Sequence, residues 1–89
     1  MNIFTYLKEK RQLSLIYQHI IEHKAFSLRL ADNHLNDLRV YLLYAGFTLL
    51  QNNAHVIKSQ NDTFKVNVYL FDDKTEIEAK NLAVPNLYM

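Results

Sequence analysis

The chain has 89 residues, 49% of them apolar, which is enough for a single small domain with its own core. It contains no cysteine, and this excludes disulfides, thiolate zinc sites and cysteine nucleophiles. Lysine and arginine total 10 and aspartate and glutamate total 9, so the net charge of +1 favours neither a strongly basic nucleic-acid-binding domain nor an acidic DNA mimic. We therefore expect one domain that spans residues 1–89.

The sequence shows no pattern of membrane insertion or export. No apolar run approaches the roughly 20 residues that are needed to cross a bilayer. The first residues lack the basic start and the small-residue cleavage site of a signal peptide. The sequence therefore predicts a cytoplasmic protein that does not associate with membranes.

Residues 3–23 have the pattern of a core-facing helix. The apolar side chains that recur at the spacing of one helix face are Leu13, Ile16, Tyr17, Ile20 and Ile21. The charged run at residues 8–12 is expected to face water. Residues 25–30 then alternate apolar and polar side chains, which predicts a short strand with one buried face.

A second helix is predicted over residues 34–45. Leu35, Leu38 and Leu42 lie on one face of it, and Asp32-Asn33 before it has the character of a turn and a helix cap. Gly46, the only glycine, stands where a left-handed residue commonly ends a helix. The last turns are apolar nearly all round, so Val40, Leu43 and Tyr44 are expected to be buried on more than one side.

The period of the pattern changes to two after Gly46. Residues 47–51, 55–58 and 63–71 are predicted strands, and one alternative merges residues 48–58 into a single irregular strand. Asp72-Asp73 is expected to end the sheet. Residues 75–82 are predicted to form a short helix capped by Asp73 or Thr75, and the apolar tail that follows is expected to pack onto the domain.

These elements predict an α+β fold. We expect a two-layer sandwich in which an N-terminal helix precedes a β-α-β-β(-β) unit with a mainly antiparallel sheet, followed by the short C-terminal helix. The helices would cover the aliphatic face of the sheet. The opposite face would remain open, because an antiparallel sheet can leave one face in contact with water.

The open sheet face is the predicted functional surface. It combines aromatic, basic and amide side chains, and the candidate partner-binding residues are Arg29, Lys65, Asn67, Tyr69 and Phe71. Aromatic residues and arginine are the types that dominate protein interfaces. Two alternatives stay open: the C-terminal segment covers this face, or Tyr69 and Phe71 are simply peripheral.

One stretch matches a metalloenzyme motif. Residues 19–23 read His-x-x-Glu-His, the inverted zinc-protease pattern, and a helix would place His19 and His23 one turn apart on one side. The chain is far smaller than such enzymes, and the stretch ends a helix that also supplies core residues. We therefore expect no metal site, with His19 and His23 as candidates for adventitious metal binding only.

No other catalytic pattern is present in the sequence. A single glycine excludes a phosphate-binding loop, a dinucleotide fingerprint and a nucleophile elbow. The pair Asp72-Asp73 is explained more simply by capping than by acid–base chemistry. The sequence predicts neither an enzyme nor a cofactor.

By elimination, the sequence predicts a small protein-interaction module that occupies the surface of a protein partner whose identity it does not reveal. Phages and mobile elements encode many accessory or inhibitory proteins that are small and compact and lack glycine-rich sites and cofactors. A homodimer formed through an exposed edge strand or through Tyr41, Leu43 and Tyr44 is a variant of this hypothesis. Single-stranded nucleic-acid binding through the sheet face is the alternative. Zinc-dependent hydrolysis through His19, Glu22 and His23 is a second alternative.

Overall fold

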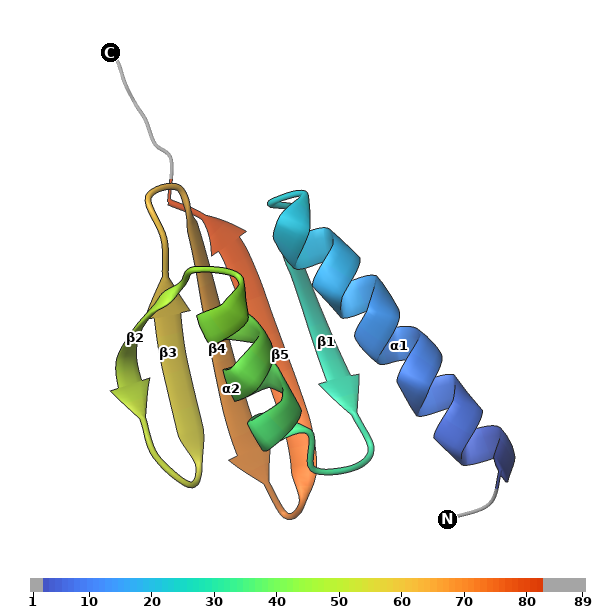
Figure 1. Cartoon of the computed structure of the whole chain (residues 1–89). Coiled ribbons are helices and arrows are strands. Elements are labelled where there is room, and N and C mark those ends of the chain that lie inside the picture. The colour runs from blue at the N-terminus through green and yellow to red at the C-terminus, as the bar shows by residue number, and fades with distance from the viewer. Residues whose placement is uncertain (1–2, 83–89) are drawn as a thin grey trace.

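The computed structural model describes residues 3–82, which form one α+β domain with a five-stranded antiparallel sheet and two helices. In chain order the elements are α1 (Ile3–Ile21), β1 (Phe26–Leu30), α2 (Leu35–Tyr44), β2 (Thr48–Asn52), β3 (Val56–Gln60), β4 (Phe64–Phe71) and β5 (Lys74–Asn81). Both helices lie on the same side of the sheet, with α1 against β1 and α2 over β3 and β4 (Figure 1). The predicted α+β class with a mainly antiparallel sheet is therefore confirmed.

The strands follow the order β1-β5-β4-β3-β2, and every neighbouring pair is antiparallel. The strands β2, β3, β4 and β5 form a meander, whereas β1 joins the sheet by pairing with β5. The alternative of one irregular strand over residues 48–58 is wrong, because β2 and β3 are separate strands with a register shift between Leu49 and Gln51.

The helix predicted for residues 75–82 is wrong, because this segment is β5, an inner strand of the sheet. Its buried side chains, Thr75, Ile77 and Ala79, alternate with Glu76, Glu78 and Lys80, and this period of two belongs to a strand. Asp72 and Asp73 do not cap a helix. They form the hairpin turn between β4 and β5, with φ values of 48° and 63°, and this left-handed backbone is what tight hairpin turns require.

The prediction that a left-handed Gly46 ends the second helix, α2, is confirmed. Gly46 has a φ of 88°. The N–H of Gly46 donates to the carbonyl of Leu43 over 3.1 Å, and the N–H of Phe47 donates to the carbonyl of Leu42 over 2.9 Å. This pair of bonds closes the helix and directs the chain into β2, since glycine adopts positive φ without steric cost. At the other end, the side chain of Asn33 accepts a hydrogen bond from the N–H of Leu35.

The core lies between the helices and the sheet. Its fully buried large side chains include Ile16 and Ile20 of α1, Leu38 and Leu42 of α2, and Leu30, Ile57, Phe64, Val66, Val68 and Ile77 of the sheet. The aliphatic faces predicted for the helices and for the sheet meet in this core. Within the described residues, no helix is both long and apolar enough to span a membrane.

Several burial predictions are wrong. Val40, Leu43 and Tyr44 are 59%, 56% and 87% exposed, because α2 lies on the outside of the sheet with no further layer of the described chain over it. Ile21 is also exposed at the end of α1. Conversely, Glu9 in the charged run at residues 8–12 is only 5% exposed. The predicted packing of the tail concerns residues 83–89, which lie outside the described residues.

Candidate functional site

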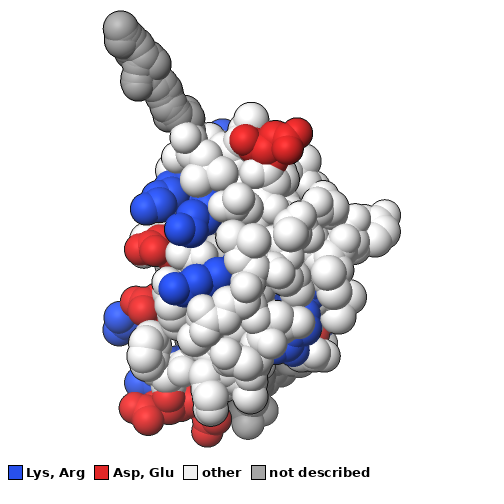
Figure 2. Space-filling view, turned by 90° about the vertical axis from the view of Figure 1, so that its left-hand side faces the viewer, with Lys and Arg blue, Asp and Glu red and all other residues white. Residues whose placement is uncertain are grey.

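The five residues predicted for the open sheet face do lie together on it. Arg29 comes from β1, and Lys65, Asn67, Tyr69 and Phe71 occupy alternate positions of β4, opposite in direction to the core side chains Phe64, Val66 and Val68. In Figure 2 the charged side chains gather along the left-hand side, where this face lies, whereas the right-hand side over α2 is mostly uncharged. The face is therefore polar, and its aromatic part is restricted to one end.

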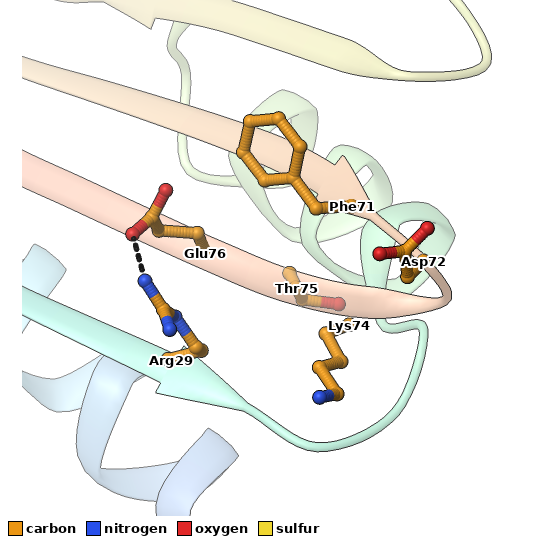
Figure 3. Close-up of a pocket in the computed structure, with 6 residues that line it drawn as sticks. All are labelled: Arg29, Phe71, Asp72, Lys74, Thr75 and Glu76. Carbon is orange, nitrogen blue, oxygen red and sulfur yellow. Dashed lines mark hydrogen bonds and ion pairs between the residues drawn. The ribbon is translucent and has the colours of Figure 1, made fainter.

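Arg29 and Phe71 line the same hollow at that end (Figure 3). The hollow has a volume of about 270 Å³, and Asp72, Lys74, Thr75 and Glu76 complete its lining. Inside it the guanidinium of Arg29 forms an ion pair with the carboxylate of Glu76, with an N–O distance of 3.0 Å. This pair is mostly exposed, so its net contribution to stability is small. The hollow suits a polar or charged group rather than an apolar side chain.

Tyr69 stacks on Phe71 at this end of the face, with ring centroids 6.3 Å apart. Phe71 remains 58% exposed, and Val56 of β3 lies directly across from Tyr69 in the ladder. The rings of Tyr69 and Phe71 form a small aromatic platform beside the hollow. A stacked pair of this kind presents ring faces to which a planar group can bind.

The other end of the open sheet face is basic. Lys65 of β4 and Lys80 of β5 are direct ladder partners, so two ammonium groups extend from adjacent positions on one face. Lys58 of β3 lies opposite Asn67, one row away. Like charges directly opposite each other destabilise a sheet, and an anion bound between them removes that cost.

Asn67 lies between the aromatic and basic ends and is only 6% exposed, although it faces the open side. Its Oδ1 atom is buried and accepts no hydrogen bond from residues 3–82. Its ladder neighbours are Lys58 and Glu78, whose long side chains flank it on both sides. Little of the Asn67 side chain is therefore exposed at the surface of this face. A partner-binding role of all five residues stays a prediction.

A second surface lies on the helical side, and the sequence suggested it only as a homodimer contact through Tyr41, Leu43 and Tyr44. A groove between α1 and α2, called the helical groove below, has a mainly apolar and aromatic lining that includes Tyr17, Ile20, Ile21, Val40, Tyr41 and Tyr44, and its polar lining residues are His23, Asp37 and Asn61. It consists of two shallow hollows of about 410 and 260 Å³ that share Tyr41 and Tyr44. The signal was present in the apolar last turns of α2, which were interpreted as core.

Tyr17 and Tyr41 cross the helical groove and pack against each other. Partial burial is the main reason why the pKa of each phenol is raised above its ordinary value. The charge of Asp37 adds to the effect on Tyr17, and Tyr44 adds to the effect on Tyr41. Both phenols are therefore neutral at physiological pH, and the groove presents a mainly aromatic surface with the carboxylate of Asp37 in its lining.

The arrangement required by the His-x-x-Glu-His pattern is not formed. The helix ends at Ile21, and His23 has a left-handed φ of 56°, so His19 and His23 are not one helical turn apart. The ring of His23 instead stacks on Phe64 with centroids 5.1 Å apart, and its Nδ1 lies 3.0 Å from the hydroxyl of Thr63. The ring of His19 packs near Phe26. Both histidines serve local packing.

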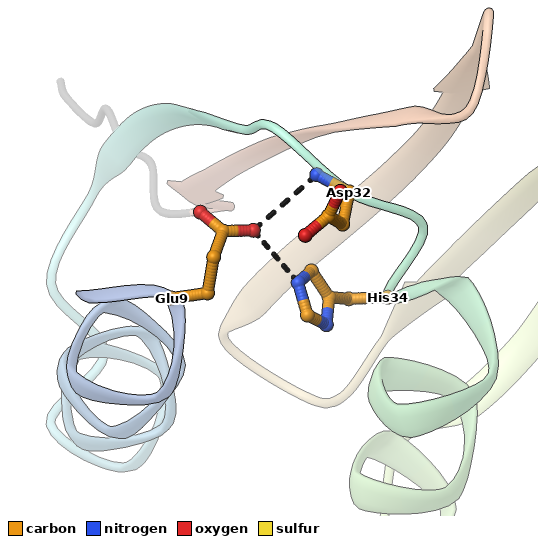
Figure 4. A group of neighbouring side chains, drawn as sticks. All are labelled: Glu9, Asp32 and His34. Atoms are coloured by element: carbon orange, nitrogen blue, oxygen red, sulfur yellow. Dashed lines mark hydrogen bonds and ion pairs between the residues drawn. The ribbon is translucent and has the colours of Figure 1, made fainter. Parts of the chain in front are cut away.

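A buried polar cluster lies at the opposite end of α1 (Figure 4). The carboxylate of Glu9 is 2.8 Å from Nε2 of His34, and it accepts hydrogen bonds from the N–H groups of Asp32 over 3.3 Å and Ala31 over 3.5 Å. The cluster connects α1 to the loop between β1 and α2. The sequence places Glu9 in a solvated charge run, Asp32 in a turn and His34 at the start of the second helix, so no local pattern indicates the cluster.

The comparisons with known proteins do not indicate a function for this chain. Protein-family models, curated proteins and solved structures include no match to this chain. The geometry itself offers three features with different chemistry: the mixed open sheet face, the mainly aromatic helical groove and the buried polar cluster. These three features are therefore the candidate functional sites of the described chain.

Proposed function

We propose that the protein is a non-enzymatic module that binds a protein partner by occupying an apolar part of that partner's surface. The observation that carries the proposal is the exposure of Val40, Leu43 and Tyr44 on α2, next to the helical groove. Single exposed apolar residues are ordinary, but a contiguous apolar patch on a small domain is typical of an interaction site.

The composition of the helical groove supports a protein partner rather than a charged ligand. Asp37 and Arg39 are the charged residues of α2. Arg39 is directed away from the groove, because its guanidinium bonds to the side chain of Asn52 and the carbonyl of Asn53. Asp37 lines one of the two hollows, so one carboxylate accompanies three tyrosines there, and tyrosine combines a large contact area with few rotatable bonds.

The shape of the groove favours an amphipathic helix as the occupant. The groove runs between two helices, and α2 has 10 residues, which corresponds to a length of about 15 Å. A partner helix of about three turns matches that length, and apolar side chains at its i, i+3, i+4 and i+7 positions would contact Val40, Tyr41 and Tyr44. Because the contact is apolar, its affinity should change little with added salt.

Site-specific photo-crosslinking in a lysate of the producing cells tests this proposal. A photoreactive phenylalanine analogue would replace Tyr44 in the helical groove, Phe71 on the open sheet face, or the exposed Asp62 in the turn between β3 and β4. We expect a protein crosslinked from position 44 only. Crosslinks from position 71 only would move the interface to the sheet face, as the sequence analysis predicted, and equal yields at all three positions would refute a specific interface.

Matched variants then measure the contribution of each surface. Tyr44→Asp should weaken binding of the crosslinked protein at least tenfold, in the range expected for a central interface residue. Phe71→Ala is the control and should leave the affinity unchanged. Sedimentation of the free protein, with and without Tyr44→Asp, determines whether a second copy of the chain occupies the groove instead.

A second candidate function is favoured by the open sheet face. The direct opposition of Lys65 and Lys80 at one end, with the stacked Tyr69 and Phe71 further along the same strand, matches the pairing of cations and aromatic platforms that binds single-stranded nucleic acid. Fluorescence anisotropy with labelled single-stranded oligonucleotides tests it. Binding should weaken steeply with salt and be lost in Lys65→Glu, whereas Tyr44→Asp should have no effect. Binding that ignores salt or Lys65→Glu would exclude this candidate.

A further inference from the structure

We infer that Glu9, Asp32 and His34 form a binding site for one divalent transition-metal ion, with Zn²⁺ as the best match. Each residue offers one ligand atom, and the three atoms lie within 4.8 Å of one another. Two carboxylates and one imidazole form an oxygen and nitrogen donor set that suits Zn²⁺ or Mn²⁺ better than a thiolate-preferring ion. Figure 4 shows the three side chains converging from α1 and from the loop before α2.

The carboxylate of Asp32 is the first independent indication of a ligand. Its Oδ2 atom is shut off from solvent and has no hydrogen-bond partner among residues 3–82. A buried carboxylate oxygen without a partner is costly, and it lies next to the second, largely buried carboxylate of Glu9. A bound cation would supply the missing partner of Asp32 and offset the repulsion between the two carboxylates.

Among the described residues that line this hollow, no lysine or arginine fills this role. Lys10 lines the same hollow, but its ammonium group lies over the ring of Tyr6, 5.5 Å from the ring centroid. Asp37, at the rim of the hollow, adds a third carboxylate. The hollow has a volume of about 270 Å³ and includes Glu9, Asp32 and His34 in its lining, so an ion has access to the ligands from solvent.

The surroundings of the ligands resemble the outer shell of a metal site. The N–H groups of Ala31 and Asp32 orient the carboxylate of Glu9. With Nε2 of His34 directed at Glu9, the other ring nitrogen, Nδ1, lies 3.6 Å from the carboxylate of Asp37. A carboxylate on the far side of a ligating histidine is the common arrangement that sets its tautomer and orientation.

The loop that carries two of the ligands is held in place by the sheet. The hydroxyl of Thr75 in β5 donates to the carbonyl of Asp32 over 2.7 Å and accepts the N–H of His34 over 2.8 Å. Thr75 itself is fully buried. Asp32 and His34 are therefore positioned before any ion binds, which reduces the ordering cost of binding.

The distances require only a modest adjustment. Zinc bonds of about 2.0–2.2 Å to oxygen and nitrogen place neighbouring ligand atoms of a tetrahedral site roughly 3.3 Å apart. The oxygen of Glu9 and Nε2 of His34 are 2.8 Å apart and would separate slightly, while the carboxylate of Asp32 would approach them. Water would supply the fourth ligand.

Calorimetric titration of the tag-free protein with ZnCl₂ tests the inference. We expect one ion per chain, a rise in melting temperature on zinc addition, and at least tenfold weaker binding in Asp32→Asn. This variant should fold normally, because the amide has the same shape as the carboxylate and Oδ2 of Asp32 has no hydrogen-bond partner among the described residues. His19→Gln and His23→Gln are the controls and should bind zinc like the wild type.

Three results would overturn the inference: no saturable zinc binding, unchanged affinity in Asp32→Asn, or loss of binding in His19→Gln or His23→Gln. Any of them would leave the contact between Glu9 and His34 as a hydrogen-bonded pair that simply fastens α1 to the loop. A Co²⁺ titration gives a second readout, because the visible absorption of bound cobalt reports its coordination. The spectrum should disappear in Asp32→Asn and persist in His19→Gln.

Discussion

The hydroxyl of Tyr41 donates a hydrogen bond to the backbone carbonyl of Tyr17 over 3.2 Å, and the two rings stack with centroids 4.1 Å apart. The contact joins α2 to α1 above the sheet. It also fixes the floor of the helical groove, because both rings belong to the lining of one of its hollows. The proposed interface therefore rests on a contact that also stabilises the fold.

Replacing Tyr41 with phenylalanine should destabilise the protein modestly. The variant keeps the stacked ring and loses the hydrogen bond to Tyr17, so the free energy of unfolding should fall by about 0.5–1.5 kcal/mol. Urea unfolding measures the change. Tyr44→Phe is the matched control, since Tyr44 is 87% exposed and should change stability by less than about 0.5 kcal/mol. Equal effects in the two variants would contradict this role of Tyr41.

The protein should lose stability at alkaline pH through the same pair of tyrosines. The raised pKa values of Tyr17 and Tyr41 mean that the folded state favours the neutral phenols. Their contribution is present in full below the ordinary tyrosine pKa of about 10 and is lost as pH rises through the raised values. Absorbance titration of the phenolates, together with unfolding between pH 8 and 12, measures this loss. Tyr41→Phe should show a smaller drop above pH 10, and an identical drop would contradict the assignment.

Replacing Asp73 with glycine should stabilise the hairpin between β4 and β5. Asp73 has a φ of 63°, a conformation that glycine adopts without the steric cost borne by other residues. We expect a gain of up to about 1 kcal/mol in thermal or urea unfolding, because relief of the left-handed strain of about 1–2 kcal/mol is partly offset by the greater unfolded-state entropy of glycine. Asp62→Gly in the turn between β3 and β4 is the control, because Asp62 does not have a positive φ. A loss of stability in Asp73→Gly would contradict this expectation and would show that the side chain of Asp73 stabilises the hairpin.

Replacing Lys80 with glutamate should stabilise the sheet by about 0.2–1 kcal/mol, because it converts the like-charge pair with Lys65 into an opposite-charge pair. The gain should shrink as salt is added. Lys74→Glu is the control, since Lys74 lies opposite Phe71 and not opposite a charge. The same Lys80→Glu protein should lose any binding of single-stranded nucleic acid, so stability and binding change in opposite directions.

The sequence pattern predicted most of the fold because burial follows periodicity in these segments. The alternation in β1 and β4, the apolar face of α2 and the single glycine at its end all lead to the observed elements. The pattern was misinterpreted at β5, where the core positions are occupied by Thr75, Ile77 and Ala79. Threonine and alanine are weak hydrophobic signals, and the preceding aspartates are as typical of a helix cap as of a turn.

The candidate sites were predicted less completely, for a physical reason. The residues of the open sheet face lie on two strands whose alternation is visible in the sequence, so their common face was predictable. The cluster of Glu9, Asp32 and His34 depends on how α1 crosses the sheet, and this orientation is set by the packing of the whole core. The exposure of Leu43 and Tyr44 likewise depends on the absence of a layer above α2 within the described chain.

The position of β5 has a consequence for how the chain becomes a folded protein during synthesis. Arg29 on β1 and Glu76 on β5 are 47 residues apart in the chain, and their strands are direct neighbours. Until β5 has left the ribosome, β1 has no partner strand in the native sheet, so the nascent chain carries an unpaired edge. Closing so distant a pairing is slow, and an unpaired edge invites association with other chains. Native structure in this domain should therefore appear late and all at once, and a chain interrupted before Lys74 should be held by chaperones or degraded.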